Sequence, residues 1–209
     1  MKKTAKLNPY QLCFLAMAVG INLVGGQLAL MLRLPIYLDS IGTILAGAVL
    51  GPWLGMVPNL LSGIIMGMTV DVYSLYFAPV GMITGFMSGL LLGRKWGSSA
   101  GVFGLGRQSG GRTPWLFLIA AGITIPGTAV SSLINAVLFG GITSSGSTIL
   151  VQLLSRTPLG LTGSIFAVQI LTDYADRCIS IFAVSVFAAL LGREMRMRLR
   201  GGVGSNGAV

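Results

Sequence analysis

Residues 11–32 read QLCFLAMAVGINLVGGQLALML, a run without a charged side chain, and residues 33–39 that follow read RLPIYLD. About 20 apolar residues suffice to cross the hydrocarbon core of a bilayer, so this run is predicted to be a transmembrane helix. Pro35 opposes continuation of the helix, so the run ends in a connecting loop. The run is also too long for a signal peptide, and no small-residue cleavage site follows it.

The rest of the 209-residue chain has the same apolar character. Hydrophobic residues make up 54% of the sequence and charged residues only 9%. A soluble domain carries roughly a quarter of its residues as charged side chains. We therefore predict an all-α, polytopic membrane protein of the cell membrane, in contact with the lipid bilayer.

The basic residues indicate how the chain is oriented. Most of the 14 Lys and Arg lie in three blocks, Lys2–Lys6, Arg94–Arg112 and Arg193–Arg200. Basic residues that flank transmembrane helices tend to stay on the cytoplasmic side. The three blocks predict cytoplasmic termini and an even number of spans, and this placement, beside apolar segments, argues against a nucleic-acid partner.

Turn residues divide the chain into six predicted spans that form a single bundle over residues 1–192. A basic cytoplasmic tail over residues 193–209 follows the bundle. The stretch 140–172, which has a polar opening, predicts a long outer loop whose short helices dip toward the bundle. The spans are expected near residues 11–32, 40–50, 54–70, 76–92, 113–139 and 173–191.

Glycines recur at four-residue spacing in the predicted helices. Small residues at this spacing let the backbones of membrane helices approach closely. We expect these glycines to pack the protein's own helices against one another: Gly47/Gly51/Gly55, Gly63/Gly67 and Gly81/Gly85/Gly89.

Polar side chains gather at the predicted outer side and suggest a binding pocket there. Asp173, Asp176 and Arg177 share roughly one face of the last predicted helix. These three residues could equally form an interfacial cap with an internal ion pair. Tyr37, Tyr73 and Tyr76, which are predicted near the same level, could belong to an aromatic belt. The candidate substrate-binding residues are Arg33, Tyr37, Asp39, Asp71, Tyr76, Asn135, Asp173, Asp176 and Arg177.

No catalytic signature occurs in the sequence. The chain has no His, no Cys/His metal spacing and no glycine-rich phosphate loop that ends in Lys-Ser or Lys-Thr. We therefore expect no enzymatic activity, no metal and no cofactor in this chain. Any energy from ATP would have to come from a partner subunit.

Three stretches carry a resemblance to a known family. Residues 34–43 (LPIYLDSIGT), residues 50–55 (LGPWLG) and residues 173–180 (DYADRCIS) resemble the S-components of energy-coupling factor (ECF) transporters, the membrane subunits that bind vitamins and related micronutrients. The resemblance covers nearly the whole chain, and size and span number agree with it.

The resemblance implies a substrate-binding subunit of an ECF-type importer that captures a vitamin-like solute outside. It implies two cytoplasmic ATPase subunits and one transmembrane coupling subunit as partners. The family's Ala-x-x-x-Ala motif on the first helix, matched here by Ala16 and Gly20 with Gly in place of the second Ala, would dock on the coupling subunit. Cobalamin, a pyridoxine-like compound and queuosine precursors all remain open as substrates. The alternative is a membrane sensor or assembly module without transport.

Overall fold

The computed structural model describes residues 8–93, 113–140, 146–156, 158–190 and 199, and over these residues all regular secondary structure is helical. This confirms the predicted all-α class. The helices are α1 (Pro9–Met31), α2 (Ile41–Leu50), α3 (Pro52–Gly55), α4 (Val57–Thr69), α5 (Tyr73–Leu91), α7 (Thr113–Ile134), the π-helical turn η1 (Asn135–Phe139), α8 (Ser147–Leu154) and α9 (Gly160–Leu190).

Three of these helices are long and apolar enough to cross a membrane. They cover Pro9–Met31, Tyr73–Leu91 and Leu116–Phe139, with mean hydropathies of 1.8, 1.4 and 1.8. Large apolar side chains lie exposed on their outer faces, among them Met31, Phe117 and Leu133. The described part of the chain is thus suited to a multi-pass membrane protein.

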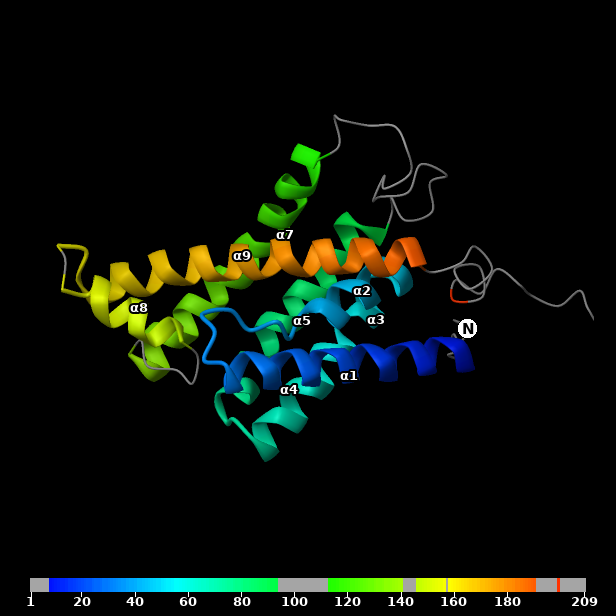
Figure 1. Ribbon diagram of the computed structural model, residues 1–209, viewed down its shortest axis with the longest axis horizontal. Coiled ribbons are helices and arrows are strands. Elements are labelled where there is room, and N and C mark those ends of the chain that lie inside the picture. Colours follow the sequence, from blue (N-terminus) through cyan, green and yellow to red (C-terminus); the bar gives the residue numbers. More distant parts are fainter. Residues whose placement is uncertain (1–7, 94–112, 141–145, 157, 191–198, 200–209) are drawn as a thin grey trace, which may run out of the picture.

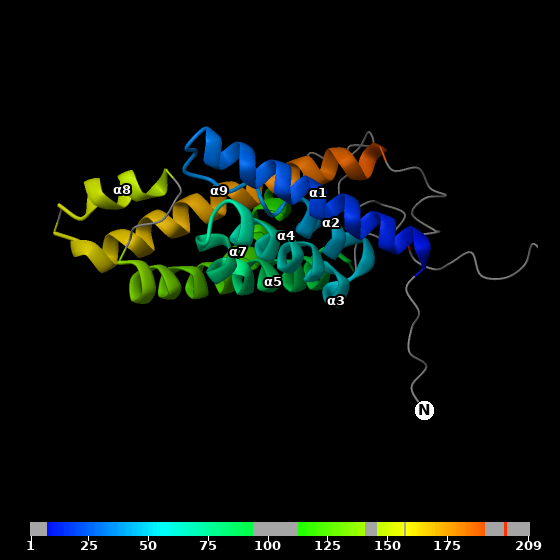
Figure 2. The same ribbon diagram turned by 90° about the horizontal axis from the view of Figure 1, so that it is seen from below.

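The two longest helices are α1 and α9. They run along the long axis of the molecule in opposite directions, and α2, α3 and α5 lie between them in Figure 1. α8 lies beside the first turns of α9 in both views (Figures 1 and 2), where Val151 packs with Ile165 and Val168. The main apolar core gathers around α2, which contributes Ile44, Leu45 and Ala46. Residues 42–49 of α2 are all buried, so this short helix is enclosed by its neighbours.

The helix ends follow from local sequence chemistry. The backbone N–H of Tyr10 donates to the Asn8 side chain (3.3 Å), and the Asn8 N–H donates to Gln11 Oε1 (3.1 Å), which caps the start of α1. Between α2 and α3 the chain turns at Gly51, whose φ of 98° is in the region that favours glycine. Pro52 then occupies the first turn of α3, where a missing N–H costs nothing.

Glycines bring α2, α3 and α5 into backbone contact, as the four-residue spacing predicted. A Cβ added at Gly85 would lie 2.1 Å from the Gly55 carbonyl oxygen, and one at Gly47 would lie 2.7 Å from the Gly85 oxygen. One at Gly89 would lie 2.4 Å from the Pro52 Cα. Only glycine permits this approach, and every such contact is internal to the chain.

The last helix begins earlier than the sequence predicted. The sequence predicts an outer loop with short helices through residue 172 and a span from Asp173. The stretch does contain the short helix α8, but α9 is continuous from Gly160, so Asp173 lies in mid-helix. The polarity of this segment led to the wrong boundary. Ser164 and Thr172 hydroxyls bond to helix carbonyls within the segment, and Gln169 is buried, so these polar groups are satisfied inside the fold.

The other predicted boundaries differ from the helices by a few residues. The predicted span near residues 54–70 is divided between α3 and α4 at Met56, which lies between the two helices and keeps right-handed helical backbone angles. The predicted spans near 11–32, 40–50, 76–92 and 113–139 correspond to α1, α2, α5 and α7 with η1. The basic blocks and the tail over 193–209 lie almost wholly outside the described residues.

Candidate functional site

A buried polar network lies where the loop between α1 and α2 meets the middle of α9. The loop contributes Ser40, which is fully buried. The helix contributes Asp176 and Arg177, which are 1% and 7% exposed. Polar groups at this depth in an apolar bundle are costly unless they find partners, and they commonly mark a functional site.

Asp176 fastens the loop to α9. One carboxylate oxygen accepts the backbone N–H of Leu38 at 2.8 Å, and the other accepts the Ser40 hydroxyl at 2.8 Å. The Ser40 oxygen also lies 3.1 Å from the hydroxyl of Ser180, one helical turn along α9. Leu38 itself has a φ of 52°, unusual for a residue with a side chain, so the loop is held in a strained conformation by these contacts.

The Arg177 guanidinium is occupied by neighbours in this network. Its NH1 group forms an ion pair with Asp176 and donates to Ser40 Oγ at 2.7 Å. Its NH2 group donates to Thr84 Oγ1 on α5 at 3.2 Å. The Asp176–Arg177 ion pair therefore links α9, α5 and the loop between α1 and α2.

Asp173 lies one turn earlier on α9 and accepts three hydrogen bonds. Thr128 and Ser131 on α7 donate to Oδ2 at 2.8 and 3.0 Å, and Gln169 donates to Oδ1 at 3.0 Å. The Gln169 oxygen in turn accepts the Asn135 side-chain amide at 3.4 Å. Asn135 begins the π-helical turn η1, a backbone irregularity often found at functional sites.

A second set of contacts joins α1 to α2 at the edge of this region. The Asn22 amide donates to Thr43 Oγ1 at 2.7 Å, and its oxygen accepts the Gly42 N–H at 2.8 Å. The Asn59 amide on α4 donates to the Asp39 carbonyl at 3.3 Å. These bonds position the residues before α2, including Asp39.

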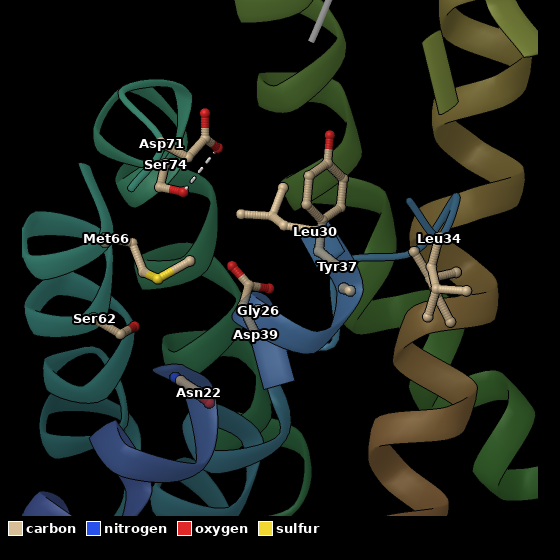
Figure 3. A pocket seen from close by; sticks show the side chains of 13 residues that line it. Asn22, Gly26, Leu30, Leu34, Tyr37, Asp39, Ser62, Met66, Asp71 and Ser74 are labelled. Carbon is tan, nitrogen blue, oxygen red and sulfur yellow. Dashed lines mark hydrogen bonds between the residues drawn. The ribbon is translucent and has the colours of Figure 1, made fainter. Parts of the chain in front are cut away.

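Two small cavities open onto this network and share Tyr37 and Asp39. The first, which we call the α1 cavity, has a volume of about 30 Å³ and is shown in Figure 3, where the Asp39 carboxylate points between Met66 and Tyr37. Its other polar residues include Asn22, Ser62, Asp71 and Ser74, and a dashed line in Figure 3 marks the Ser74–Asp71 hydrogen bond.

The second cavity, which we call the α9 cavity, has a volume of about 40 Å³, room for a few water molecules. A ligand of vitamin size would need the surrounding loop to move. The cavity is lined by Tyr37, Asp39, Asn59, Phe77, Val80, Gly81, Ser131, Gln169, Asp173, Asp176 and Arg177.

The environment alters the acidity of Asp39, which lies in the loop. Burial is the main cause that raises the pKa of its carboxyl to about 6, and the nearby negative charge of Asp176 adds to the effect. The positive charge of Arg177 acts in the opposite direction. The carboxyl is therefore mostly ionised only above pH 6.

The structure brings together five of the nine sequence-predicted site residues around the α9 cavity: Tyr37, Asp39, Asp173, Asp176 and Arg177. Asp71 lines the adjoining α1 cavity, and Asn135 reaches the network through Gln169. Tyr76 lies 48% exposed, with its ring packed on Phe139. Arg33 is exposed at the end of α1 and lines neither cavity.

Several polar residues of the network are not among the site residues that the sequence predicted. They are uncharged and lie within apolar helices or at their ends: Asn22, Ser40, Asn59, Thr84, Thr128, Ser131 and Gln169. The sequence feature that could have identified them is an amide or hydroxyl side chain inside a predicted transmembrane span. For hydroxyls this signal is weak, because Ser and Thr can bond to their own helix, as Thr124 does with the Ala120 carbonyl.

Comparison with protein-family models, with curated protein sequences and with solved structures gives no match to this chain.

Proposed function

We propose that this protein is the substrate-binding subunit of an ECF-type importer, which captures a vitamin or related micronutrient at the outer side of the cell membrane. The observation that carries the proposal is the pair of charge-lined cavities inside an otherwise apolar helical bundle. Charged groups this deep in a membrane protein commonly belong to a solute site. The resemblance of residues 34–43, 50–55 and 173–180 to ECF S-components supports the same assignment.

The proposal includes six spans with both termini in the cytoplasm. The spans are α1, α2, the α3–α4 pair, α5, α7 with η1, and α9. α2 has only 10 residues, fewer than a lipid-facing span needs. Its central residues are enclosed by other helices, and a short element is tolerated at membrane depth when protein rather than lipid surrounds it.

In this assignment the loop between α1 and α2 covers the site from outside, and Asp176 holds it closed. Uptake would depend on a transmembrane coupling subunit and two cytoplasmic ATPases, since this chain carries no ATP-binding motif. The protein itself would bind and release solute without catalysing a reaction. It needs no cofactor for that role.

The coupling face is proposed to lie on α1 at Ala16 and Gly20. Both residues are exposed, and a Cβ added at Gly20 would meet nothing within 4 Å. Leu12, Val24 and Leu28 continue the same exposed stripe at four-residue spacing. A stripe with two small residues at its middle permits close approach of a partner helix.

Bulky substitutions on this face test the proposal. Ala16→Trp and Gly20→Trp should abolish co-purification with the coupling subunit and uptake in cells, because a large ring forces two close backbones apart. Ligand retention by the isolated protein should persist. Leu133→Trp is the matched control, since Leu133 lies 59% exposed on α7, and it should assemble and transport normally.

The same variants separate transport from the alternative role. Normal assembly of both Trp variants would move the docking face elsewhere. A wild-type protein that binds solute yet never associates with a coupling subunit or supports uptake would contradict the proposal and favour a membrane sensor.

A further inference from the structure

The α9 cavity has more negative than positive charge around it. Three carboxylates line it, from Asp39, Asp173 and Asp176, against the single guanidinium of Arg177. The adjoining α1 cavity adds Asp71 and contributes no basic side chain. Arg33 and Arg156 are exposed and line neither cavity.

Arg177 offsets only part of this excess, because its guanidinium already forms an ion pair with Asp176. Both of its terminal nitrogens are taken, NH1 by Asp176 and Ser40 and NH2 by Thr84. An anionic ligand is therefore left with the Nε donor alone, unless it displaces Asp176, Ser40 or Thr84 from the terminal nitrogens. Within the described residues Asp39 and Asp173 form no ion pair, so two carboxylates remain without a matching cation.

Asp173 is held by hydrogen-bond donors that carry no positive charge. Thr128, Ser131 and Gln169 supply three uncharged hydrogen bonds. A cation bound beside this carboxyl would favour its ionised form, and the attraction between the two charges is stronger in a medium of low dielectric than in water.

Two further observations, independent of the carboxylates, point to a bound molecule. Arg177 is 7% exposed and lines the cavity, yet its Nε has no hydrogen-bond partner among the described residues. A buried donor left in this way is costly unless a ligand or a water accepts from it. Tyr37 and Phe77 add aromatic rings to the cavity wall, and aromatic faces attract organic cations.

We propose that the α9 cavity selects a small organic cation, a protonated amine or a positively charged heterocycle, that also carries one uncharged hydrogen-bond acceptor. The loop between α1 and α2 must move to admit such a ligand. In the bound state Asp39 and Asp173 face the positive group, Tyr37 and Phe77 pack against its apolar part, and the Arg177 Nε donates to the acceptor. This substrate class rests on the proposed role as a solute-binding subunit. A metal ion fits the site less well, since no three acidic or thiol side chains in the described ranges converge as metal ligands do.

Three probes of nearly the same shape test the sign of the charge: benzamidinium, benzamide and benzoate. Each is titrated into the purified full-length protein in detergent micelles at pH 7.5 and constant ionic strength, with the unfolding temperature as readout. At this pH the Asp39 carboxyl is mostly ionised, since its pKa is about 6. We expect benzamidinium to raise the unfolding temperature at concentrations at least about tenfold below benzamide, and benzoate to have no effect.

Neutral isosteres of the two carboxylates show where the cation sits. Asp173→Asn and Asp39→Asn should each remove most of the preference for benzamidinium over benzamide. Asp39 lies in a loop, so its variant keeps the test usable if Asp173→Asn fails to fold. Arg156→Gln, which changes an exposed charge outside both cavities, should bind like the wild type.

The results of these titrations can be distinguished from the results that test the importer role. Stronger stabilisation by benzoate, equal effects of all three probes, or an unchanged preference in both Asn variants would each overturn the cation assignment. Assembly with the coupling subunit and the effect of Gly20→Trp would stand in those cases. A cation preference in a protein that never joins a coupling subunit would instead retain the substrate class and remove the importer role.

Discussion

At the scale of single residues, the Asp176–Arg177 pair is the centre of the fold's polar interior. The two side chains reach Leu38 and Ser40 on the loop and Thr84 on α5, so one ion pair joins three parts of the chain. Burial removes water from both charged groups, so forming such a pair costs free energy, and breaking it by removing one partner costs still more. Removal of one partner leaves the other charge uncompensated in an apolar environment.

Removal of one member of this pair should therefore cost more stability than removal of both. Asp176→Ala should lower the free energy of unfolding by about 3–5 kcal/mol, because Arg177 would remain charged and buried without its carboxylate. The double variant Asp176→Leu/Arg177→Met should recover much of that loss. Denaturant unfolding in detergent micelles measures both values.

A loss in Asp176→Ala no larger than that of an exposed charge variant such as Arg156→Gln would contradict this account. It would mean that solvent reaches the pair and screens it.

At the scale of elements, contact between α2, α3 and α5 depends on the absence of side chains. Gly47, Gly55 and Gly85 meet backbone to backbone, and this close packing encloses the short helix α2. α2 in turn begins directly after Ser40, so the loop that borders both cavities is positioned by these glycine contacts.

A single methyl group at this contact should disturb the bundle. The Cβ of Gly85→Ala would lie 2.1 Å from the Gly55 carbonyl oxygen, on a helix that cannot yield without moving its backbone. We expect a loss of about 1–3 kcal/mol in unfolding free energy, as for other overpacked interiors. Detergent unfolding curves provide the measurement.

The matched control is Gly20→Ala, where the added Cβ meets nothing within 4 Å. This variant should be neutral or slightly more stable, because alanine favours a helix over glycine. Equal losses at both positions would show that helix propensity, and not the contact of α5 with α3, decides the result.

At the scale of the whole molecule, the charges divide between two environments. The acidic side chains Asp39, Asp173 and Asp176 are gathered around the α9 cavity. Most basic residues lie in the three blocks that precede, interrupt and follow the helices. This separation is the basis for the proposed orientation, with all three basic blocks in the cytoplasm.

Cysteine labelling in intact cells tests that orientation. In a background with Cys13→Ser and Cys178→Ser, single cysteines at Ser99 and Ser205 should resist a membrane-impermeant thiol reagent. A cysteine at Ser145, between η1 and α8, should react. All three should react after the membrane is permeabilised, which controls for burial.

Labelling of the Ser99 position from outside would contradict the six-span topology, because it would place the second basic block on the outer side.

The sequence by itself determined the properties that depend on composition and local pattern. The apolar run at residues 11–32 predicted α1, and the spacing of Gly47, Gly55 and Gly85 predicted helix contacts, since both signals act over a few turns of one segment. The charges at Asp39, Asp173 and Asp176 were recognised as a group because ionised side chains are rare in such a chain.

Only the tertiary structure decided which groups partner one another and where the last helix begins. Asp173 accepts from Thr128, 45 residues away in the chain, and Asp176 holds Ser40, 136 residues away, so neither bond has a local signature. The same holds for Gln169, which lies in the stretch expected as a loop and accepts from Asn135, 34 residues away in the chain. Packing brings these groups together, and a polar residue in an apolar segment is stable in a helix only when the fold supplies its hydrogen bonds.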